Sequence, residues 1–167
     1  MDALLDANIE PFVTLYHWDL PQRLQEEGGW PERKVTTAFV EYADLVSRSL
    51  GDRVRHWVTL NEPHVSAFVG YLDGQHAPGH TDLHEALRAS HHLLLAHGLA
   101  MPVVRANCLD ARVGIALDFR PQTPASSSVA DRDAAWHAGG VINRWFLDPL
   151  SGRGYPEDIR RAYGDEM

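Results

Sequence analysis

The sequence predicts an α/β protein built on a parallel sheet. Three short apolar runs suited to strands, residues 11–16, 56–60 and 112–117, alternate with longer segments of helical pattern. A polar residue follows each run, and strands that alternate with helices form parallel sheets through right-handed crossovers. The pattern fits a doubly wound sheet or part of a barrel.

The N-terminal elements follow from local composition. Residues 2–8 have the pattern of the last turns of a helix, with Asn8 as its stop signal. The run 11–16 is too short for a helix and rich in strand formers. Because its apolar residues do not strictly alternate with polar ones, we expect both faces of this strand to be buried. A loop through Gly28 and Gly29 follows.

Two amphipathic helices are predicted next. The first carries its apolar face on Val35, Phe39, Tyr42, Val46 and Leu50 and is closed by Gly51. A long loop is expected over 65–81. The second begins at Leu83, with Asp82 as its N-cap and Glu85 three residues later. Pro102 lies inside its pattern and is expected to kink or end it.

The last third of the chain is less regular. A Pro/Ser-rich loop, 121–128, leads to a predicted helix at about 131–145, and turn signals dominate from residue 150 to the end. The chain contains no solenoid repeat. We therefore expect residues 1–167 to belong to a single domain.

Composition excludes several functions. The net charge is −8 with no basic block, so neither nucleic acid nor an anionic membrane surface is an expected partner. Cys108 is the only cysteine, so no intrachain disulfide can form, and we expect a cytoplasmic location. No glycine-rich phosphate-binding motif follows any strand. A nucleotide fold therefore has no support.

Asn61 and Glu62 stand where the second strand ends, followed by Pro63. Ligands of parallel barrels meet the chain at the C-terminal ends of strands, and a carboxylic acid there is a candidate proton donor. Asn-Glu-Pro is also a reasonable strand terminator, because proline stops pairing. Both interpretations stay open from these residues alone.

The histidines and tryptophans invite two further interpretations. His80 and His84 are four residues apart, but no carboxylate stands at matching spacing, so we expect no metal and no cofactor. Flat aromatic faces bind sugars as well as fill cores. We expect four tryptophans to belong to the core: Trp30, Trp57, Trp136 and Trp145.

Several stretches of the chain form a recognisable set when they are taken in order. They are Glu10–Pro21, Gly28–Trp30, Trp57–Pro63, Ala77–Gly79, His97–Gly98 and Asn143–Leu150. They cover nearly the whole chain, and the segment around Asn61, Glu62 and Pro63 is the most specific when combined with the others. Together they resemble glycoside hydrolase family 1, the β-glucosidase family.

This resemblance implies a partial (β/α)₈ barrel, with the three strands as strands 3–5. It implies retaining hydrolysis of terminal β-D-glycosides, with a β-glycoside or oligosaccharide as substrate. Glu62 matches the general acid/base, His17 and Asn61 match residues that hold sugar hydroxyls, and Trp18 matches an aromatic beside that sugar. Residues 64–79 would line the aglycone entrance, where His64 is a further candidate contact; Asp118 stands where relatives more often have asparagine.

The resemblance also implies a missing part. A retaining glycosidase needs a second carboxylate about 5–5.5 Å from the first, and the family carries it in a Thr-Glu-Asn-Gly motif that this sequence lacks. We therefore expect a central fragment that is inactive alone, with the missing barrel segments as its partner. Two alternatives remain: a non-catalytic carbohydrate-binding remnant, and one subunit of a split barrel.

Overall fold

The structure, a computed structural model, describes residues 1–164. The chain forms two compact units, which divide after Ala116. The elements of the first unit are α1 (Asp2–Asp6), β1 (Phe12–Tyr16), α2 (Gln22–Glu26), α3 (Arg33–Leu50), β2 (His56–Asn61), the π-helix η1 (Val65–Val69), α4 (Leu83–Asn107) and β3 (Arg112–Ala116).

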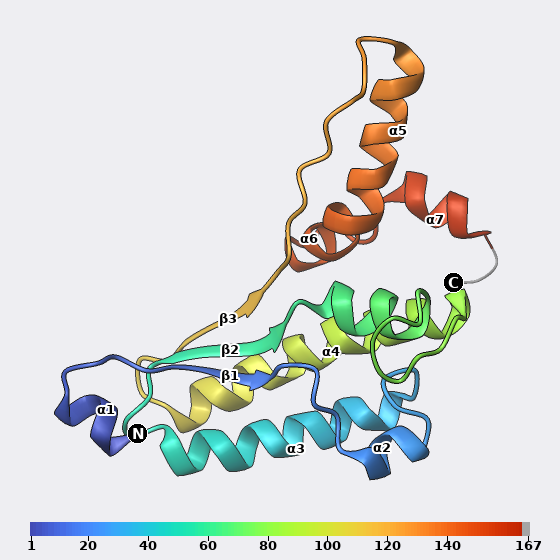
Figure 1. Cartoon of the computed structure of the whole chain (residues 1–167). Helices are drawn as coiled ribbons and strands as arrows, with labels where there is room; N and C mark the ends of the chain where they lie inside the picture. The colour runs from blue at the N-terminus through green and yellow to red at the C-terminus, as the bar shows by residue number, and fades with distance from the viewer. Residues whose placement is uncertain (165–167) are drawn as a thin grey trace. The chain divides into compact units, whose positions relative to one another are not determined.

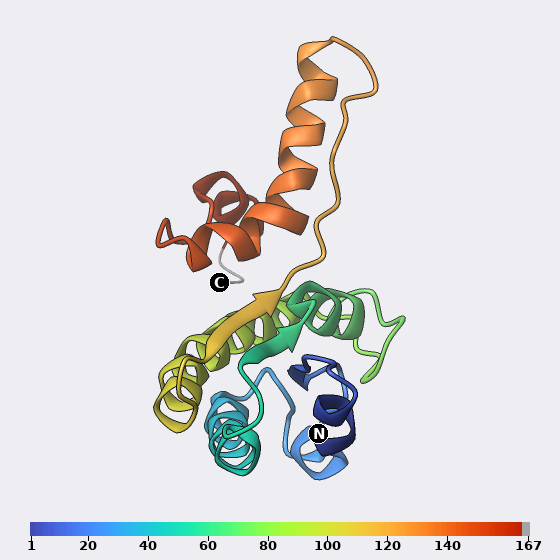
Figure 2. The same ribbon diagram turned by 90° about the vertical axis from the view of Figure 1, so that its left-hand side faces the viewer.

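The predicted parallel sheet is confirmed. Its strand order is β1-β2-β3, and both pairs of neighbours are parallel. The crossover helices α3 and α4 lie on the same face of the sheet (Figures 1 and 2). Right-handed crossovers that move to the next strand in one direction keep their helices on one face. This is the winding of a barrel segment, whereas a doubly wound sheet would have helices on both faces.

The core of the first unit lies between the sheet and these two helices. Trp57 and Thr59 of β2 are buried there, and α4 presents fully buried alanines to its neighbours, Ala89, Ala96 and Ala100 among them. Small side chains let a helix approach its neighbours closely.

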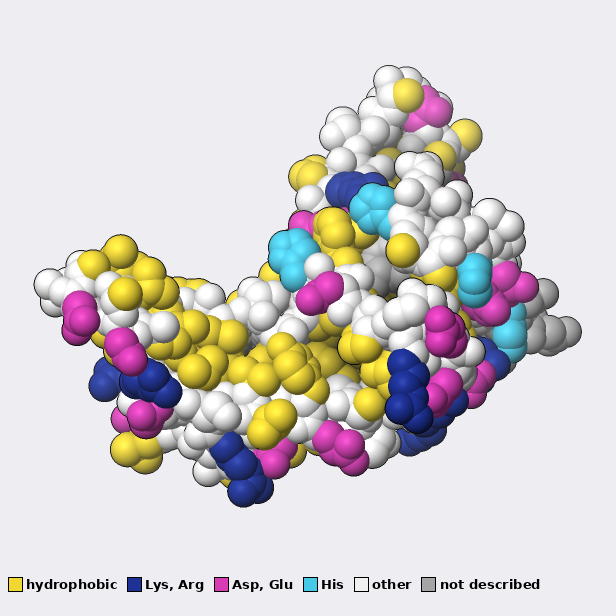
Figure 3. All heavy atoms as spheres, turned by 60° about the horizontal axis from the view of Figure 1, so that its bottom comes forward, with side chains coloured by type: hydrophobic (Ala, Val, Ile, Leu, Met, Phe, Trp, Pro, Cys, Tyr) yellow, Lys and Arg dark blue, Asp and Glu magenta, His cyan; other side chains and the backbone are white. Residues whose placement is uncertain are grey.

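Our expectation that both faces of β1 are buried was wrong. Phe12 is 67% exposed and stacks on the ring of His56, at 4.2 Å between centroids. The reason is that both crossover helices pack against the other face. Hydrophobic side chains are also exposed at the end of the molecule that carries α1 and the start of β1 (Figures 1 and 3). They include Leu4, Leu5 and Ile9.

The predicted start of α4 is confirmed, whereas α4 does not end at Pro102 and the segment before it is not all loop. Asp82 caps α4 as expected, since its carboxylate accepts the Glu85 N–H at 2.9 Å. Pro102 does not end α4, which continues to Asn107; the buried residues Ala100 and Val104 on either side hold the helix in place. Residues 65–81 are not all loop, because η1 begins three residues after Glu62. Among the described residues, no helix is long and apolar enough to cross a bilayer.

The second unit is helical. The helix predicted at 131–145 is in fact three successive segments, and a further helix occupies the tail, where only turns were expected. The segments are α5 (Val129–Gly139), the π-helix η2 (Gly140–Arg144), α6 (Trp145–Leu150) and α7 (Glu157–Tyr163). Trp145 is buried and stacks on Tyr155 with 4.4 Å between ring centroids.

Trp136 is not a core residue, contrary to our expectation: it is 63% exposed. The guanidinium of Arg144 lies 4.0 Å from the centre of its ring. Arg144 also donates to both carboxylate oxygens of Asp158, at 3.0 and 2.6 Å, which lowers the pKa of Asp158 to about 2. The tryptophan therefore serves as a surface partner for a cation, an arrangement typical of arginine.

The packing of the first unit can be tested at Gly51, which directly follows α3. A β-carbon added at Gly51 would lie 2.5 Å from Cys108 Sγ and 2.8 Å from the carbonyl oxygen of Asn107. We expect Gly51→Ala to lower the free energy of unfolding by about 1–3 kcal/mol. Gly98→Ala is the matched control, because nothing lies within 4 Å of that position; it should stabilise the helix slightly. Equal urea midpoints for the two variants would refute this packing.

His97 gives the first unit a pH dependence. Its Nδ1 lies 2.7 Å from Thr59 Oγ1, and burial lowers the pKa of His97 from 6.5. Below about pH 6.5, His97 therefore takes up a proton more readily in the unfolded chain than in the folded chain. Stability from this site is complete above about pH 6.5 and falls as the pH drops below it.

We expect His97→Gln to flatten this decline. The measurement is the free energy of unfolding in urea at pH 7.5 and at pH 5 for both proteins. An equally steep loss in the variant would show that His97 does not contribute to it.

Candidate active site

The candidate site lies at the C-terminal edge of the sheet. His17 and Trp18 directly follow β1, Asn61 is the last residue of β2, and Glu62 comes next. Tyr16 and Leu60 are register partners in the parallel pair. The two strands therefore deliver their following residues to the same place.

Three of the four predicted site residues contact one another. The Trp18 indole N–H donates to the backbone carbonyl of Asn61 at 3.0 Å. The Asn61 amide nitrogen lies 3.3 Å from His17 Nε2, so the amide donates to the imidazole when that nitrogen is unprotonated. The rings of His17 and Trp18 meet edge to face at 4.9 Å. These contacts fix the polar groups of two strands relative to each other.

Glu62 has an unusual backbone conformation. Its φ is +46°, and that of Trp18 is +77°, a region that few non-glycine residues adopt. The Glu62 N–H donates to Ala116 O of β3 at 2.8 Å, and the Glu62 carbonyl accepts the N–H of Val65 in η1 at 2.9 Å. Positive φ at such a position is held only when the surroundings determine it, and it is found preferentially at functional sites.

The strand before Glu62 is also irregular. The β2–β3 register shifts between Val58 and Asn61, and η1 follows shortly after. Bulges and π-helical turns often re-aim side chains next to active sites. Among residues 1–164, the carboxyl group of Glu62 has no hydrogen bond or ion pair with another side chain. This acid is half-buried and available to an external partner.

The two weaker candidates are His64 and Asp118. His64 is 7% exposed and packs against Phe68, with 5.4 Å between ring centroids. It is a buried residue at the start of η1 and not part of an exposed loop. Asp118 belongs to the second unit, where the guanidinium of Arg120 donates to it at 3.1 Å.

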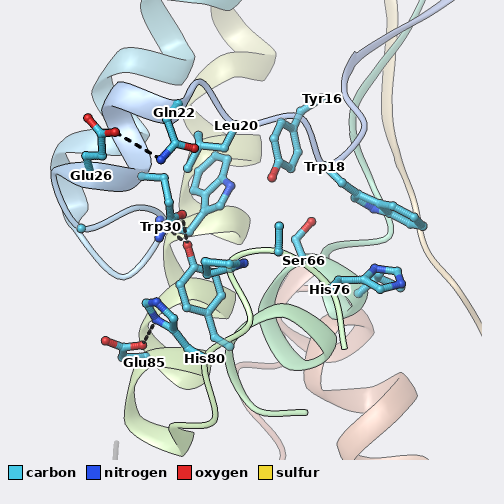
Figure 4. Close-up of a pocket in the computed structure, with 16 residues that line it drawn as sticks. Tyr16, Trp18, Leu20, Gln22, Glu26, Trp30, Ser66, His76, His80 and Glu85 are labelled. Carbon is cyan, nitrogen blue, oxygen red and sulfur yellow. Dashed lines mark hydrogen bonds and ion pairs between the residues drawn. The ribbon is translucent and has the colours of Figure 1, made fainter. Parts of the chain in front are cut away.

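A cavity of about 530 Å³ adjoins the candidate site and was not predicted. Trp18 lines it, together with residues of the β1–α3 connection, η1 and the loop before α4 (Figure 4). Tyr16, Trp30 and Ser66 are among its lining residues. No periodicity or motif links these residues, because they come from three separate segments.

The histidines do not form a metal site within the part of the chain that the structure describes, where no group of three His, Cys, Asp or Glu side chains is suitably placed. His80 instead pairs with Glu85, with 2.6 Å between its Nδ1 and the carboxylate. His76 lies beside Trp18, at 5.4 Å between ring centroids.

The chain is 45% identical over 162 residues to a β-glucosidase A of Acetivibrio thermocellus, covering 97% of this chain and 36% of that protein. It is 42% identical over 176 residues to a 1,4-β-D-glucan glucohydrolase of Thermotoga neapolitana, covering 100% of this chain and 41% of that protein. The chain thus spans well under half the length of these relatives.

A solved structure agrees with the fold. The structure of a Thermotoga maritima family 1 glycoside hydrolase complexed with a cyclophellitol analogue, a transition-state mimic, matches with a TM-score of 0.96 and 42% identity. The match covers 99% of this chain and 38% of that one. The sequence profile of "Glycosyl hydrolase family 1" matches residues 1–167. The chain therefore belongs to glycosyl hydrolase family 1.

Proposed function

We propose that this chain carries the acid/base half of a retaining β-glucosidase, which hydrolyses terminal β-D-glucosides. The observation that supports this most is the placement of Glu62, in a left-handed conformation, beside the joined side chains of His17 and Asn61. A carboxylic acid there protonates the leaving oxygen of a glycoside and afterwards removes a proton from water. The relatives named as β-glucosidases support the same choice of substrate.

In this proposal the neighbouring residues bind the sugar. His17 and Asn61 each carry groups that donate or accept hydrogen bonds, as sugar hydroxyls require. Such bonds strengthen as the ring distorts toward the transition state. Trp18, 37% exposed, offers an aromatic surface beside them. Its N–H is already bound to Asn61 O, so we assign it a packing contact with the sugar.

The nucleophile is the part that this sequence does not contain. We propose that both units belong to one barrel domain, with β1–β3 as its strands 3–5, and that the remaining barrel segments supply the second carboxylate. Two exposed apolar residues, Phe12 on the uncovered face of β1 and Ile9 before the strand, support a partner there.

A second candidate function is carbohydrate binding without turnover. It is favoured by the absence of a Thr-Glu-Asn-Gly motif, and it uses the same residues, His17, Trp18 and Asn61. The two functions predict different results when the missing barrel segments are added. A binding protein leaves every glycoside intact, whereas the enzyme gains a second carboxylate and hydrolyses the glycoside.

The chain alone should release no nitrophenol from nitrophenyl β-glucoside. We expect co-expression with the complementary barrel segments, including their Thr-Glu-Asn-Gly motif, to give hydrolysis, because the second carboxylate then faces Glu62. Measurable turnover by the isolated chain would contradict this account of the missing half. No turnover by the assembled protein would favour carbohydrate binding alone.

Glu62→Gln tests the acid role in the assembled protein. An amide cannot deliver a proton, so we expect kcat/KM for a poor leaving group, such as methanol, to fall by about 10²–10⁴-fold. A dinitrophenolate leaving group needs little protonation, so glycosyl transfer from it should be far less affected.

Glu10→Gln is the control for this experiment. Glu10 pairs with His56 at the opposite end of the sheet, with 2.8 Å between its carboxylate and Nε2. Its loss should leave both rates nearly unchanged. An equal fall for both leaving groups in the Glu62 variant would mean that Glu62 supports the structure and is not the proton donor.

A further inference from the structure

The hydroxyl group of Thr59 links three segments of the first unit. Its Oγ1 lies 2.7 Å from His97 Nδ1 of α4, the helix that runs along β2 and β3 (Figures 1 and 2), and 3.3 Å from the carbonyl oxygen of Gly114 in β3. Thr59 has no exposed surface and His97 is 6% exposed, so water does not compete for these bonds. One side chain of β2 thus contacts a neighbouring strand and a helix at the same point.

The chemistry of the three groups fixes the direction of both hydrogen bonds. A carbonyl oxygen only accepts, whereas a hydroxyl group has one hydrogen to donate and lone pairs that accept. The Thr59 hydroxyl therefore donates to Gly114 O, and both bonds form together only when His97 carries a hydrogen on Nδ1 and donates it to Thr59. Burial lowers the pKa of His97, so the neutral ring keeps its single hydrogen on Nδ1. Hydrogen bonds in such a chain strengthen one another.

These bonds lie at the irregular part of β2. Val58 pairs with Gly114 and Asn61 pairs with Ala116, so three steps along β2 match two steps along β3, and β2 carries one extra residue between them. The β1–β2 pairing shows no such shift. A bulge of this kind leaves its extra residue without a partner in the ladder. The Thr59 hydroxyl gives Gly114 O a donor from inside the bulge.

The bulge determines where Glu62 stands. Glu62 follows Thr59 by three residues, and its N–H donates to Ala116 O at 2.8 Å. Without the extra residue, the pairing with β3 would shift by one. A shift of one residue turns each following side chain to the other face of a sheet. The direction of the Glu62 side chain therefore depends on the bulge.

We propose that His97 and Thr59 are positioning residues for Glu62, because their hydrogen bonds fix the bulge that precedes the acid. The proposal rests on the acid role assigned to Glu62 in the proposed function. A proton donor must lie within about 2.6–3.2 Å of the atom that it protonates, and a displacement of about 1 Å can cost about 100-fold in rate. A pair that only filled the core would instead support the whole sheet equally.

Amide hydrogen exchange in the full chain tests the structural part without any turnover. The N–H of Glu62 is compared with that of Arg112, which donates to Arg55 O at 2.7 Å at the opposite end of the β2–β3 pair. Thr59→Val removes the hydroxyl and nearly keeps the shape. We expect it to speed exchange at Glu62 by about tenfold relative to Arg112, as the loss of a buried hydrogen bond does. Thr59→Ser keeps the hydroxyl and should restore slow exchange.

A second buried histidine of α4 provides the matched control. His92 is 7% exposed, and its Nδ1 lies 2.9 Å from the carbonyl oxygen of Trp30, in the connection between α2 and α3. His97→Leu should change the ratio of the two exchange rates as Thr59→Val does, whereas His92→Leu should leave that ratio unchanged. His97→Asn, whose amide nitrogen can replace Nδ1 as a donor, should restore most of the protection.

The catalytic part is tested in the assembled protein. We expect Thr59→Val to lower kcat for methyl β-glucoside by about 10–100-fold, with little change in KM. Hydrolysis of dinitrophenyl β-glucoside should be far less affected, because a misplaced acid fails mainly with the poor leaving group. Thr59→Ser should restore both rates, and His92→Leu should leave both nearly unchanged.

Contrary results overturn different claims. Equal acceleration of exchange at Glu62 and Arg112 would mean that the pair only supports the fold. A selective change at Glu62, with equal effects on both leaving groups, would mean that the pair fixes the bulge but does not position the acid. If Glu62→Gln itself shows no dependence on the leaving group, the proposed acid role is wrong, and the exchange rates alone then decide whether the pair holds residue 62.

Discussion

The parallel pairing of β2 with strands on both sides is the constraint on which the site depends. Because β1 and β3 run in the same direction as β2, the residues that follow β1 and β2 meet at one edge. The hydrogen bond from Glu62 N to Ala116 O extends the pairing one residue past β2. It anchors the acid at the point where the backbone turns into η1. Loss of β3 would remove the hydrogen bond to the Glu62 N–H and leave only the contacts of its carbonyl with η1 to hold the left-handed conformation.

The two crossover helices convert this pairing into a rigid platform. Their buried alanines allow α4 to approach β2, and Thr59 joins the sheet to His97 of α4. Thr59 lies two residues before Asn61, so the helix restrains the strand close to its functional end. Trp18 Nε1 and Asn61 O then lock the β1 and β2 ends together. The site is thus supported by the helices that pack against the sheet and by hydrogen bonds between the ends of β1 and β2.

Sequence patterns predicted the regular part of this arrangement. Short apolar runs located β1, β2 and β3, and helical periodicity located α3, while Asp82 marked the start of α4 through a local hydrogen bond. The resemblance singled out His17, Trp18, Asn61 and Glu62, and the structure brings the first three into contact. The role of Glu62 remains a proposal.

The features that escaped prediction depend on tertiary packing. The π-helix after Glu62 and the exposure of Trp136 leave no periodic pattern, since each is determined by contacts with other segments. The face of β1 that was expected to be buried is open because both helices cover the other side. The cavity wall combines Tyr16, Trp30 and Ser66, which no spacing in the chain connects.

A double-mutant cycle between His17 and Asn61 tests the central claim most directly, that the ends of β1 and β2 act as one site. The measurement is kcat/KM for nitrophenyl β-glucoside in the assembled protein, for His17→Ala, Asn61→Ala and the double variant. The account predicts that the two effects are not additive, with a coupling of about 0.5–3 kcal/mol, as found for side chains in contact. Strictly additive effects would contradict it, because the two residues would then contribute to turnover independently.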